Sequence, residues 1–388
     1  MKYVKFSKFI VSTQYGYTAE ETSLVEGDAK YLRITDIVPY FVNKEQVPFC
    51  KIDDNKKKKY LINENDLLIA RTGATTGYNL VVDESYKNFV FASYLIRFNY
   101  NKNDLYPLYL KYVLKSQQWY GFVNNFISGS AQPGMNAKAF GKFQIPFFNY
   151  DIQKRISNIL STYDKLIDNN NKRIKLLEQM AENLYKEWFV RFRFPGYENV
   201  EFNGTVPSGW QYKSISESMI FYDSQRVPLS SMQRDKMYKI YPYYGAAKLM
   251  DYVNDYLFDG EYLLMGEDGT VITSGGFPVL QLVNGKFWVN NHAHVIGGKG
   301  NISTRFLYLT FCRFPIAGVV TGSAQPKISK GRLEKLKILI PDIKIMEAFN
   351  NLINPIFDEI NLLKKQLIKL TKQRDMLLPR LMSGKLEV

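Results

Sequence analysis

The sequence predicts an α+β protein: two mixed α/β globular domains separated by two long helices, which pack as an antiparallel coiled coil with pseudo-twofold symmetry. The first observation is an internal repeat, because Gly129–Pro133 and Gly322–Pro326 share the sequence Gly-Ser-Ala-Gln-Pro and lie 193 residues apart. The second is that a long segment with helical periodicity follows each copy at the same offset. A period near half the chain length of 388 residues indicates two copies of one unit, and not an array of many short repeats.

The element pattern divides the chain into two globular domains and two helical segments. Residues 1–150 and 196–341 alternate short β-branched and aromatic runs with turns rich in Gly, Asn and Asp, which is typical of strands and loops with some helix. Within the first domain, Tyr106–Gln118 has the apolar spacing of a helix. Residues 151–195 and 342–388 carry the two long helical patterns.

Capping and breaking residues set the expected ends of the long helices. Asp151 is the expected N-cap of the first helix, and Pro195-Gly196 is expected to stop it. Leu378-Pro379 is expected to mark the end of the second helix. Pro355 lies inside the second pattern, so it should kink that helix or split off a short first helix.

Apolar side chains repeat every seven residues along both predicted helices, and this period suits a helix partner better than a sheet. Each stripe extends over roughly 50 Å at 1.5 Å per residue, so it cannot remain in water. We therefore expect the helices to pack on each other, which would set the globular domains at opposite ends of a rod; packing of each helix on its own domain is the alternative. Asn170 is a polar exception of the kind that fixes register in coiled coils. The predicted seam consists of Ile156, Leu160, Ile167, Asn170, Ile174, Leu177 and Leu184 in the first helix and Ile356, Ile360, Leu363, Leu367, Leu370 and Leu377 in the second.

The charge balance favours a polyanionic partner. The net charge is +14, and the excess follows the globular domains, since residues 1–150 carry 19 basic and 13 acidic side chains while residues 201–341 carry 15 and 11. A basic surface on both domains suggests nucleic acid. Cys50 and Cys312 are too few for a disulfide scaffold and fit a reducing cytoplasm. The sequence opens without a secretory leader and has no run of 18 apolar residues, so we expect a cytoplasmic protein with no membrane span.

Motifs for chemistry are missing from the sequence. The two histidines, His292 and His294, form one His-x-His pair without a Cys pair or a carboxylate at convincing spacing, so no metal site is expected. The first domain has no histidine, which excludes a duplicated histidine-based active site. Neither a Gly-x-x-x-x-Gly-Lys-Ser/Thr phosphate loop, nor a dinucleotide-binding turn, nor an Asn/Asp-Pro-Pro-Tyr/Phe segment occurs. We expect no catalytic residues.

Several segments in order match one known family. They are Leu68–Gly77, Ser128–Pro133, Val206–Trp210, Tyr241–Ala246, Gly266–Gly269, Val289–Val295, Thr321–Pro326 and Arg374–Leu386. Over essentially the whole chain, this arrangement resembles the DNA specificity subunit of type I restriction-modification systems. It departs at the start of the first domain, which opens with Tyr3–Phe6 and lacks the Pro-Ser-Gly-Trp segment of the second.

The resemblance implies a division of labour. Each globular unit would be a target-recognition domain reading one half of a bipartite DNA target. The helices would hold the halves apart and dock two methyltransferase subunits, and a motor-nuclease subunit could join them. The resemblance places the chemistry on these partners, so S-adenosylmethionine and ATP would be bound there, and it implies that this chain is not an enzyme.

Candidate DNA contacts lie on Gly-flanked turns and in basic runs. Phosphates are bound by basic and hydroxyl side chains and by backbone N–H groups, whereas sequence is read at base edges. Residues shared by both repeats cannot distinguish two different half-sites, so they more plausibly hold the backbone or shape the domain. Asn290, Asn291 and His292 are candidates for base reading in the second domain, since Asn can pair with adenine. The other candidates are Lys57 and Lys58 in a lysine run expected to be a solvated loop, Arg71, Thr72, Thr75 and Thr76 on the first Gly-flanked turn, Ser130, Gln132, Ser323 and Gln325 in the repeated loops, and Lys138, Lys327 and Lys330 just after them.

Three other interpretations remain open at this point. The main one is a coiled-coil scaffold whose basic domains bind proteins, and retention on heparin followed by a salt series would discriminate against it. The second is a standalone DNA enzyme, which a labelled methyl donor would reveal. The third keeps the family but serves a modification-only system, and neighbouring reading frames would decide it.

Overall fold

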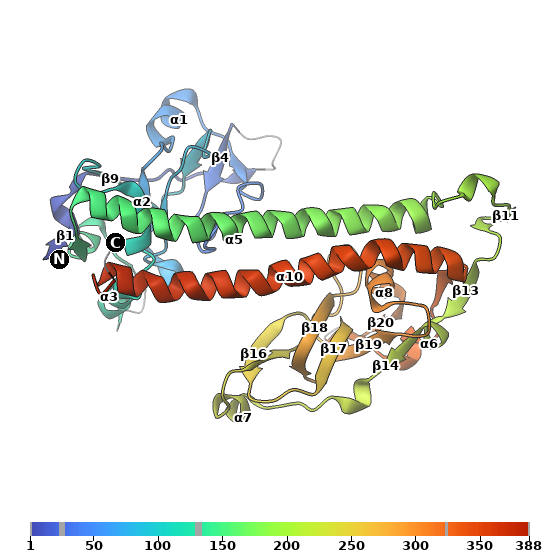
Figure 1. The fold of residues 1–388 in the computed structure, drawn as a ribbon. Helices are drawn as coiled ribbons and strands as arrows, with labels where there is room; N and C mark the ends of the chain where they lie inside the picture. Colours follow the sequence, from blue (N-terminus) through green and yellow to red (C-terminus); the bar gives the residue numbers. More distant parts are fainter. Residues whose placement is uncertain (1, 23–27, 129–133, 323–324, 387–388) are drawn as a thin grey trace. The chain divides into compact units, whose positions relative to one another are not determined.

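The computed structural model describes residues 2–22, 28–128, 134–322 and 325–386 (Figure 1). It contains two compact units. The first comprises Met1–Asn170 together with Gln366–Val388, and the second comprises Asn171–Lys365. The boundary crosses both long helices, so each unit is built from one globular part and a portion of each helix.

The first unit contains two four-stranded sheets and one strand pair. The antiparallel sheet has the spatial order β2 (Ile10–Tyr15), β9 (Leu95–Tyr100), β6 (Leu67–Ala70) and β7 (Asn79–Val81). The mixed sheet has the order β3 (Glu21–Thr22), β5 (Phe49–Cys50), β4 (Ala29–Leu32) and β8 (Phe89–Phe91), with β4 and β8 parallel. The pair consists of β1 (Lys2–Lys5) and β10 (Gln144–Phe147).

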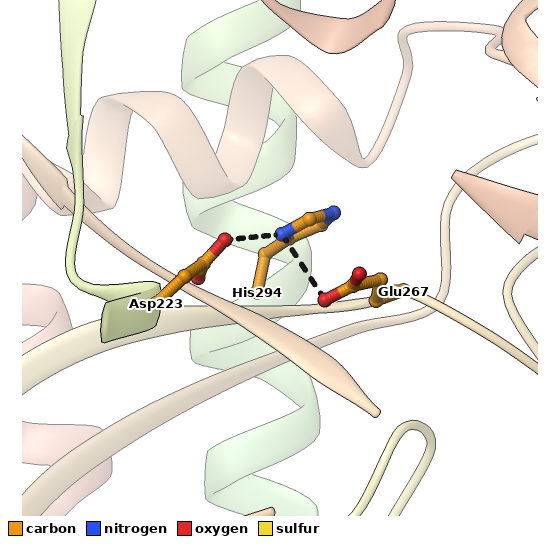
Figure 2. A group of neighbouring side chains, drawn as sticks. All are labelled: Asp223, Glu267 and His294. Carbon is orange, nitrogen blue, oxygen red and sulfur yellow. Dashed lines mark hydrogen bonds and ion pairs between the residues drawn. The ribbon is translucent and has the colours of Figure 1, made fainter. Parts of the chain in front are cut away.

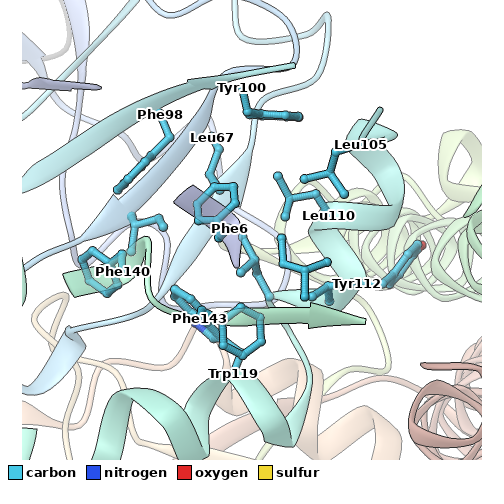
Figure 3. Packing of buried hydrophobic residues seen from close by; sticks show 14 of the residues in the cluster. Phe6, Leu67, Phe98, Tyr100, Leu105, Leu110, Tyr112, Trp119, Phe140 and Phe143 are labelled. Carbon is cyan, nitrogen blue, oxygen red and sulfur yellow. The ribbon is translucent and has the colours of Figure 1, made fainter. Parts of the chain in front are cut away.

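The main core of the first unit is strongly aromatic, as Figure 3 shows around Phe6, Trp119 and Phe140. It lies between the antiparallel sheet and helices α2 (Pro107–Val113), α3 (Gln117–Ile127) and α4 (Ala137–Phe140); a further helix, α1 (Asp54–Tyr60), lies before β6. The expected helix at Tyr106–Gln118 is therefore two helices, because the chain turns before Ser116, which caps α3 by accepting the N–H of Trp119. Trp119 is fully buried and donates its indole N–H to the Gly77 carbonyl at 2.7 Å. That bond joins α3 to the turn after β6.

The second unit is built around one six-stranded sheet. Its spatial order is β14 (Met219–Phe221), β19 (Ala293–Gly298), β17 (Phe258–Gly266), β18 (Leu280–Val289), β15 (Tyr241–Tyr244) and β16 (Leu249–Val253). Only the β15–β18 pairing is parallel within this sheet. The described part of this unit also contains three separate strand pairs: β11 (Phe202–Asn203) with β12 (Val206–Pro207), β13 (Gln211–Ser214) with β22 (Lys337–Ile340), and β20 (Val320–Thr321) with β21 (Lys327–Ile328). The short helices are α6 (Ile215–Ser218), α7 (Ser231–Asp235), α8 (Thr304–Phe311) and α9 (Lys330–Leu333).

The sequence repeat is also a repeat of local structure. In each unit the strand that precedes the long helix pairs antiparallel with a strand near the start of the globular part, as β10 does with β1 and β22 with β13. Strand β22 follows β10 by the repeat offset of 193 residues, and helix α9 follows α4 by the same offset.

The long helices are α5 (Tyr150–Tyr185), which continues as a π-helical turn over Lys186–Val190, and α10 (Ile343–Met382). The prediction that Asp151 is the N-cap of the first long helix is wrong. Asn149 caps it instead, because the Asn149 side-chain oxygen accepts the N–H of Ile152 at 2.9 Å. The helix also ends before Pro195-Gly196, since Phe192 adopts a left-handed backbone conformation with φ of 56°.

The expected end of the second helix at Leu378-Pro379 is wrong, and Pro355 does not split off a short first helix, because α10 is one continuous element through both prolines. The alternative expectation of a kink at Pro355 stays a prediction. A proline removes one backbone donor, which costs least where the carbonyl that loses it can reach water. Pro355 and Pro379 are both exposed. Packing on either side favours the helix, since Ile356 follows the first proline as a buried residue while Leu381 and Met382 follow the second as members of the first unit's core.

The predicted seam residues are buried or partly buried along both long helices. Within the first unit, Ile156 and Leu160 share one core with Leu381 and Met382 of α10, so α5 packs both on α10 and on its globular part. Asn170 is buried and donates its amide N–H to Gln366 at 3.1 Å. Eight seam residues are buried and the other five, Leu177, Leu184, Leu367, Leu370 and Leu377, are partly buried.

The helices run antiparallel within each unit. In the first, residue numbers rise along α5 while those of their partners fall along α10, as in Asp164 with Arg374 and Asn170 with Gln366. In the second, Arg173 pairs with Glu359, and Trp188 further along packs on Phe349. Burial of this apolar seam from water stabilises the pairing.

Candidate nucleic-acid interface

The first Gly-flanked turn lies directly beside the segment that follows the repeated loop. Strand β6 ends at Ala70, and Gly73 and Gly77 adopt left-handed conformations that let the chain turn into β7. The Arg71 carbonyl accepts the N–H of Met135 at 2.8 Å, and Thr72 bridges to Gly134. The repeated loop itself, with the candidates Ser130 and Gln132, lies outside the described residues.

Arg71 is held in place by backbone and aromatic groups. Its Nε–H donates to the Ser93 carbonyl at 3.3 Å, and its guanidinium carbon lies 5.2 Å from the centre of the Tyr15 ring and 5.9 Å from that of Tyr94. Both tyrosines are exposed, at 46% and 53%. The terminal amino groups of Arg71 have no protein partner among the residues that the structure describes. The site therefore presents a cation that is oriented but not neutralised.

The neighbouring threonines hold the turn itself. Thr76 is buried and donates its hydroxyl to the Gly73 carbonyl at 2.7 Å, while Thr75 donates to the Thr72 carbonyl at 3.4 Å. This geometry gives both hydroxyls a structural role, and their predicted contact with DNA stays a prediction.

The second unit repeats the backbone hydrogen bonds of this turn with other side chains. We call this shared set of backbone hydrogen bonds the turn frame. The Glu267 N–H donates to the His292 carbonyl at 2.8 Å and its carbonyl accepts the N–H of Ile328 at 2.8 Å, just as Arg71 is bonded to Tyr94 and Met135. Ile328 follows Met135 by the repeat offset of 193 residues. The backbone of Asp268 forms an isolated antiparallel β-bridge with that of Lys327, as Thr72 does with Gly134. Gly269 has the left-handed conformation of Gly73. Glu267 thus occupies the place of Arg71.

Glu267 belongs to a partly buried cluster with Asp223 and His294, as Figure 2 shows. The His294 imidazole, 1% exposed, has Nδ1 2.7 Å from Asp223 and 3.7 Å from Glu267, and Nε2 2.8 Å from the Ile328 carbonyl. Because that carbonyl can only accept, Nε2 carries a proton. Burial alone would raise the pKa of Asp223, but hydrogen bonds from His294 and from the Val295 N–H outweigh it, so this pKa lies below its usual value.

The ligand atoms of Asp223, Glu267 and His294 lie within 4.8 Å of one another, close enough to hold a metal ion. The two carboxylates are already paired with cations, however: Arg226 lies 2.7 Å from Glu267 and 3.7 Å from Asp223, and Lys327 lies 3.5 Å from Glu267. A charge-balanced cluster of this kind gains little from a further cation. We interpret it as a structural device that ties the segment after the second repeated loop to the sheet.

The base-reading candidates of the second domain differ in accessibility. Asn290 is buried, and its side-chain oxygen accepts the N–H of His292 at 2.9 Å, which gives it the role of holding the turn. Asn291 and His292 are exposed, and the His292 ring pairs with Asp268. They lie in the same frame as Lys327, whereas Ser323 lies outside the described residues.

Most of the remaining candidates are exposed. Gln325 precedes β21, Lys138 lies on α4, and Lys330 on α9 pairs with Glu334 at 3.7 Å. The predicted loop at the lysine run is wrong, because Asp53 caps a helix, α1, by accepting the N–H of Lys56. On it, Lys58 is exposed and Lys57 donates to the Asp28 carbonyl at 2.8 Å.

Sequence reasoning missed Tyr15, Tyr94, Asp223, Arg226 and Glu267. Tyr15 and Tyr94 are far apart in sequence and meet Arg71 only through the pairing of β9 with β2 and β6. The available signal was the match between the two Gly-containing turns, which aligns Arg71 with Glu267 once Gly73 is set against Gly269.

Comparison with known proteins agrees with this duplicated architecture. Residues 26–179 and 207–372 each match the model of the type I restriction modification DNA specificity domain. The chain belongs to this family. Its two domain copies and two long helices confirm the predicted fold class, and the relatives below carry the name of specificity subunits.

Two curated relatives match over most of the chain. The specificity subunit of type I restriction enzyme MjaIX from Methanocaldococcus jannaschii is 28% identical over 307 residues, which cover 74% of this chain and 71% of that protein. The EcoprrI specificity subunit from Escherichia coli is 24% identical over 370 residues, covering 89% and 87%. The crystal structure of the type I restriction-modification S subunit from M. genitalium covers 98% of this chain and 95% of its own, with a TM-score of 0.62 at 16% identity, and so supports the fold. In the part of the chain that the structure describes, no helix is both long and apolar enough to cross a membrane.

Proposed function

We propose that this chain is the DNA-reading subunit of a type I restriction-modification complex. Residues 1–150 and 196–341 act as target-recognition domains, and each reads one half of a bipartite duplex target. Residues 151–195 and 342–388 act as helical spacers. The observation that carries the proposal is the duplicated turn frame, in which equivalent backbone positions carry Arg71 in one unit and Glu267 in the other. The same backbone arrangement with a donor side chain in one unit and an acceptor side chain in the other suits two half-sites that are related but differ in sequence.

Phosphate contacts supply the affinity in this proposal. The chain has 51 basic and 37 acidic side chains, and Lys58, Lys138, Lys327 and Lys330 are exposed. Such side chains bind the DNA backbone through charge and release counterions, which positions the domain without reading sequence.

The helices serve as docking surfaces for two methyltransferase subunits. Beyond the seam, α5 and α10 carry exposed apolar side chains that no described part of the chain covers: Leu166, Leu176, Met180, Leu362, Ile368 and Met376. Apolar side chains on an otherwise charged helix surface are suited to protein contacts. We further propose that the chain works in the cytoplasm, is not catalytic, and depends on its methyltransferase and motor-nuclease partners to bind S-adenosylmethionine and ATP.

The test is selection of bound sequences from a randomised duplex library by the full chain with its methyltransferase partner, followed by titration of the selected duplex at several salt concentrations. We expect two short conserved half-sites at a fixed separation. We also expect log K to fall linearly with log salt, with a slope of about −0.9 for each phosphate contacted. A salt-insensitive affinity, or methylation by this chain without partners, would contradict the proposal. Strong protein binding without duplex selection would favour a scaffold instead.

A further inference from the structure

We propose that Arg71, held between Tyr15 and Tyr94, reads a guanine in the half-site of the first domain, and that the second domain has no guanine reader at the equivalent position. The inference rests on the proposed function and names the chemistry of one recognition position within it.

Among the described residues, the surroundings of Arg71 fix its guanidinium without using its terminal N–H groups. The backbone is pinned on both sides, by Tyr94 through the Arg71 N–H and by Met135 through the Arg71 carbonyl. The Nε–H is bound to the Ser93 carbonyl, and two tyrosine rings lie within 6 Å of the guanidinium carbon. Restraint of this kind leaves the terminal N–H groups ready to donate while removing rotational freedom in advance.

The terminal N–H groups of Arg71, which have no partner in the described part of the chain, match the hydrogen-bonding pattern of guanine. The major-groove edge of guanine presents O6 and N7, two acceptors side by side, and a planar guanidinium donates to both at once. Adenine offers a donor at the first of these positions, so it cannot replace guanine there. The exposed rings of Tyr15 and Tyr94 leave the site open to a duplex, and Gly73 next to Thr72 lets backbone come close to it.

The second unit carries a hydrogen-bond acceptor where the first unit carries a donor, at the equivalent backbone position. Glu267 is an acceptor when ionised, and its carboxylate is already bound by Arg226 and Lys327. His292, which takes the place of Tyr94, pairs with Asp268. A carboxylate that is largely buried and already paired with Arg226 and Lys327 offers no donor to guanine O6 or N7. The two half-sites should therefore differ at this position.

The experiment repeats the library selection with the intact complex and compares the unsubstituted chain with Arg71→Lys and Arg71→Ala. The unsubstituted complex should enrich a strict guanine at one position of one half-site. Both variants should lower the preference for guanine over the other bases at that position by roughly 5- to 150-fold. All other positions should be unchanged. Arg71→Lys keeps the charge but loses the planar fork, so it separates base reading from simple attraction.

Two further variants supply controls. Lys138→Ala removes an exposed cation of the same unit and should weaken binding to all sequences alike, with the guanine preference intact. Tyr15→Ala should reduce the guanine preference part of the way, because the guanidinium loses one restraining ring.

The outcomes separate the two proposals. If the unsubstituted complex enriches no bipartite sequence, the proposed function fails. If it enriches a bipartite sequence but both Arg71 variants keep every base preference, or if neither half-site contains a strict guanine, the inference on Arg71 is wrong while the proposed function stands. The other positions of the same half-site, read from the same selection, show whether the first domain of each variant is folded.

Discussion

Removal of the Asp164 carboxylate should destabilise the first unit strongly and leave the second unit almost unchanged. Asp164 is buried on α5 and accepts four hydrogen bonds: from Arg374 at 3.1 Å, Lys111 at 2.9 Å, Tyr112 at 2.8 Å and Tyr40 at 3.1 Å. Burial, together with the nearby Asp164 charge, raises the pKa of both tyrosines, so their hydroxyls remain donors at neutral pH. The carboxylate thus ties both long helices to the globular part of this unit.

The magnitude follows from what Asp164→Ala leaves behind. Loss of one partner from a buried ion pair costs about 3–5 kcal/mol, because the remaining charge stays in a poorly solvated place. Arg374 would keep Asp375 at 2.8 Å, but that carboxylate is largely exposed and such a pair contributes at most about 1 kcal/mol. We therefore expect a loss of about 3–5 kcal/mol in the free energy of unfolding of the first unit.

The repeat offers a matched control. An offset of 193 places Phe357 opposite Asp164 and Ala181 opposite Arg374 in the alignment of the two halves, and both of these residues are buried. The double variant Asp164→Phe with Arg374→Ala removes the buried cation as well as the anion. It should therefore recover about 2 kcal/mol of the loss, a coupling within the usual range for residues in contact.

Hydrogen exchange measured by mass spectrometry is the appropriate assay, because it reports the two units separately in one sample. Amides of α2 and β9 should lose protection in Asp164→Ala, while amides of β17 and β18 should keep it. The reasoning would be refuted if the single variant lost less than about 1 kcal/mol in the first unit, or if the double variant were as unstable as the single one.

Three further predictions follow from burial and from shifted pKa values. Leu363→Ala should cost about 2–5 kcal/mol in urea denaturation since Leu363 is fully buried, whereas Leu362→Ala, at a site 50% exposed, should change stability by less than about 0.5 kcal/mol. Burial raises the pKa of Cys50 and of Cys312 to about 11, so at pH 8 only about 0.1% of each thiol is ionised. Iodoacetamide should therefore alkylate both thiols slowly in the native protein, and fast labelling of either would contradict this. The pKa of Asp223 is lowered on folding, so its stabilisation is present above the unfolded value of about 3.9 and is lost as pH falls through the lower folded value; Asp223→Asn should abolish that part of the acid dependence in circular dichroism titrations.

The repeat and the seam were predictable because they depend only on spacing along the chain. Asn170 was recognised as a buried polar seam residue from its heptad position, and the structure gives it Gln366 as partner. The helix ends were not predictable in the same way. Pro379 reads as a terminator in isolation, but the burial of Leu381 and Met382 in the first unit's core favours a further turn of helix beyond it.

The candidate interface was predictable at the level of segments but not of side chains. The Gly-flanked turn marked Arg71 as a candidate DNA contact, and the structure places Arg71 beside Met135, yet the same signal included Thr76, which the fold buries. The cluster of Asp223, Glu267 and His294 joins residues up to 71 positions apart through strand pairing. No local pattern in the sequence records which of these side chains meet.

The first unit is interrupted in the sequence, whereas the second is continuous from Asn171 to Lys365. During synthesis on the ribosome, the second unit can therefore close as soon as its own segment has emerged. The first must wait, with part of its aromatic core uncovered, until the segment after Gln366 delivers Leu381 and Met382. The domain that is translated first is thus completed last, and a nonsense mutation late in the gene would damage it more than its neighbour.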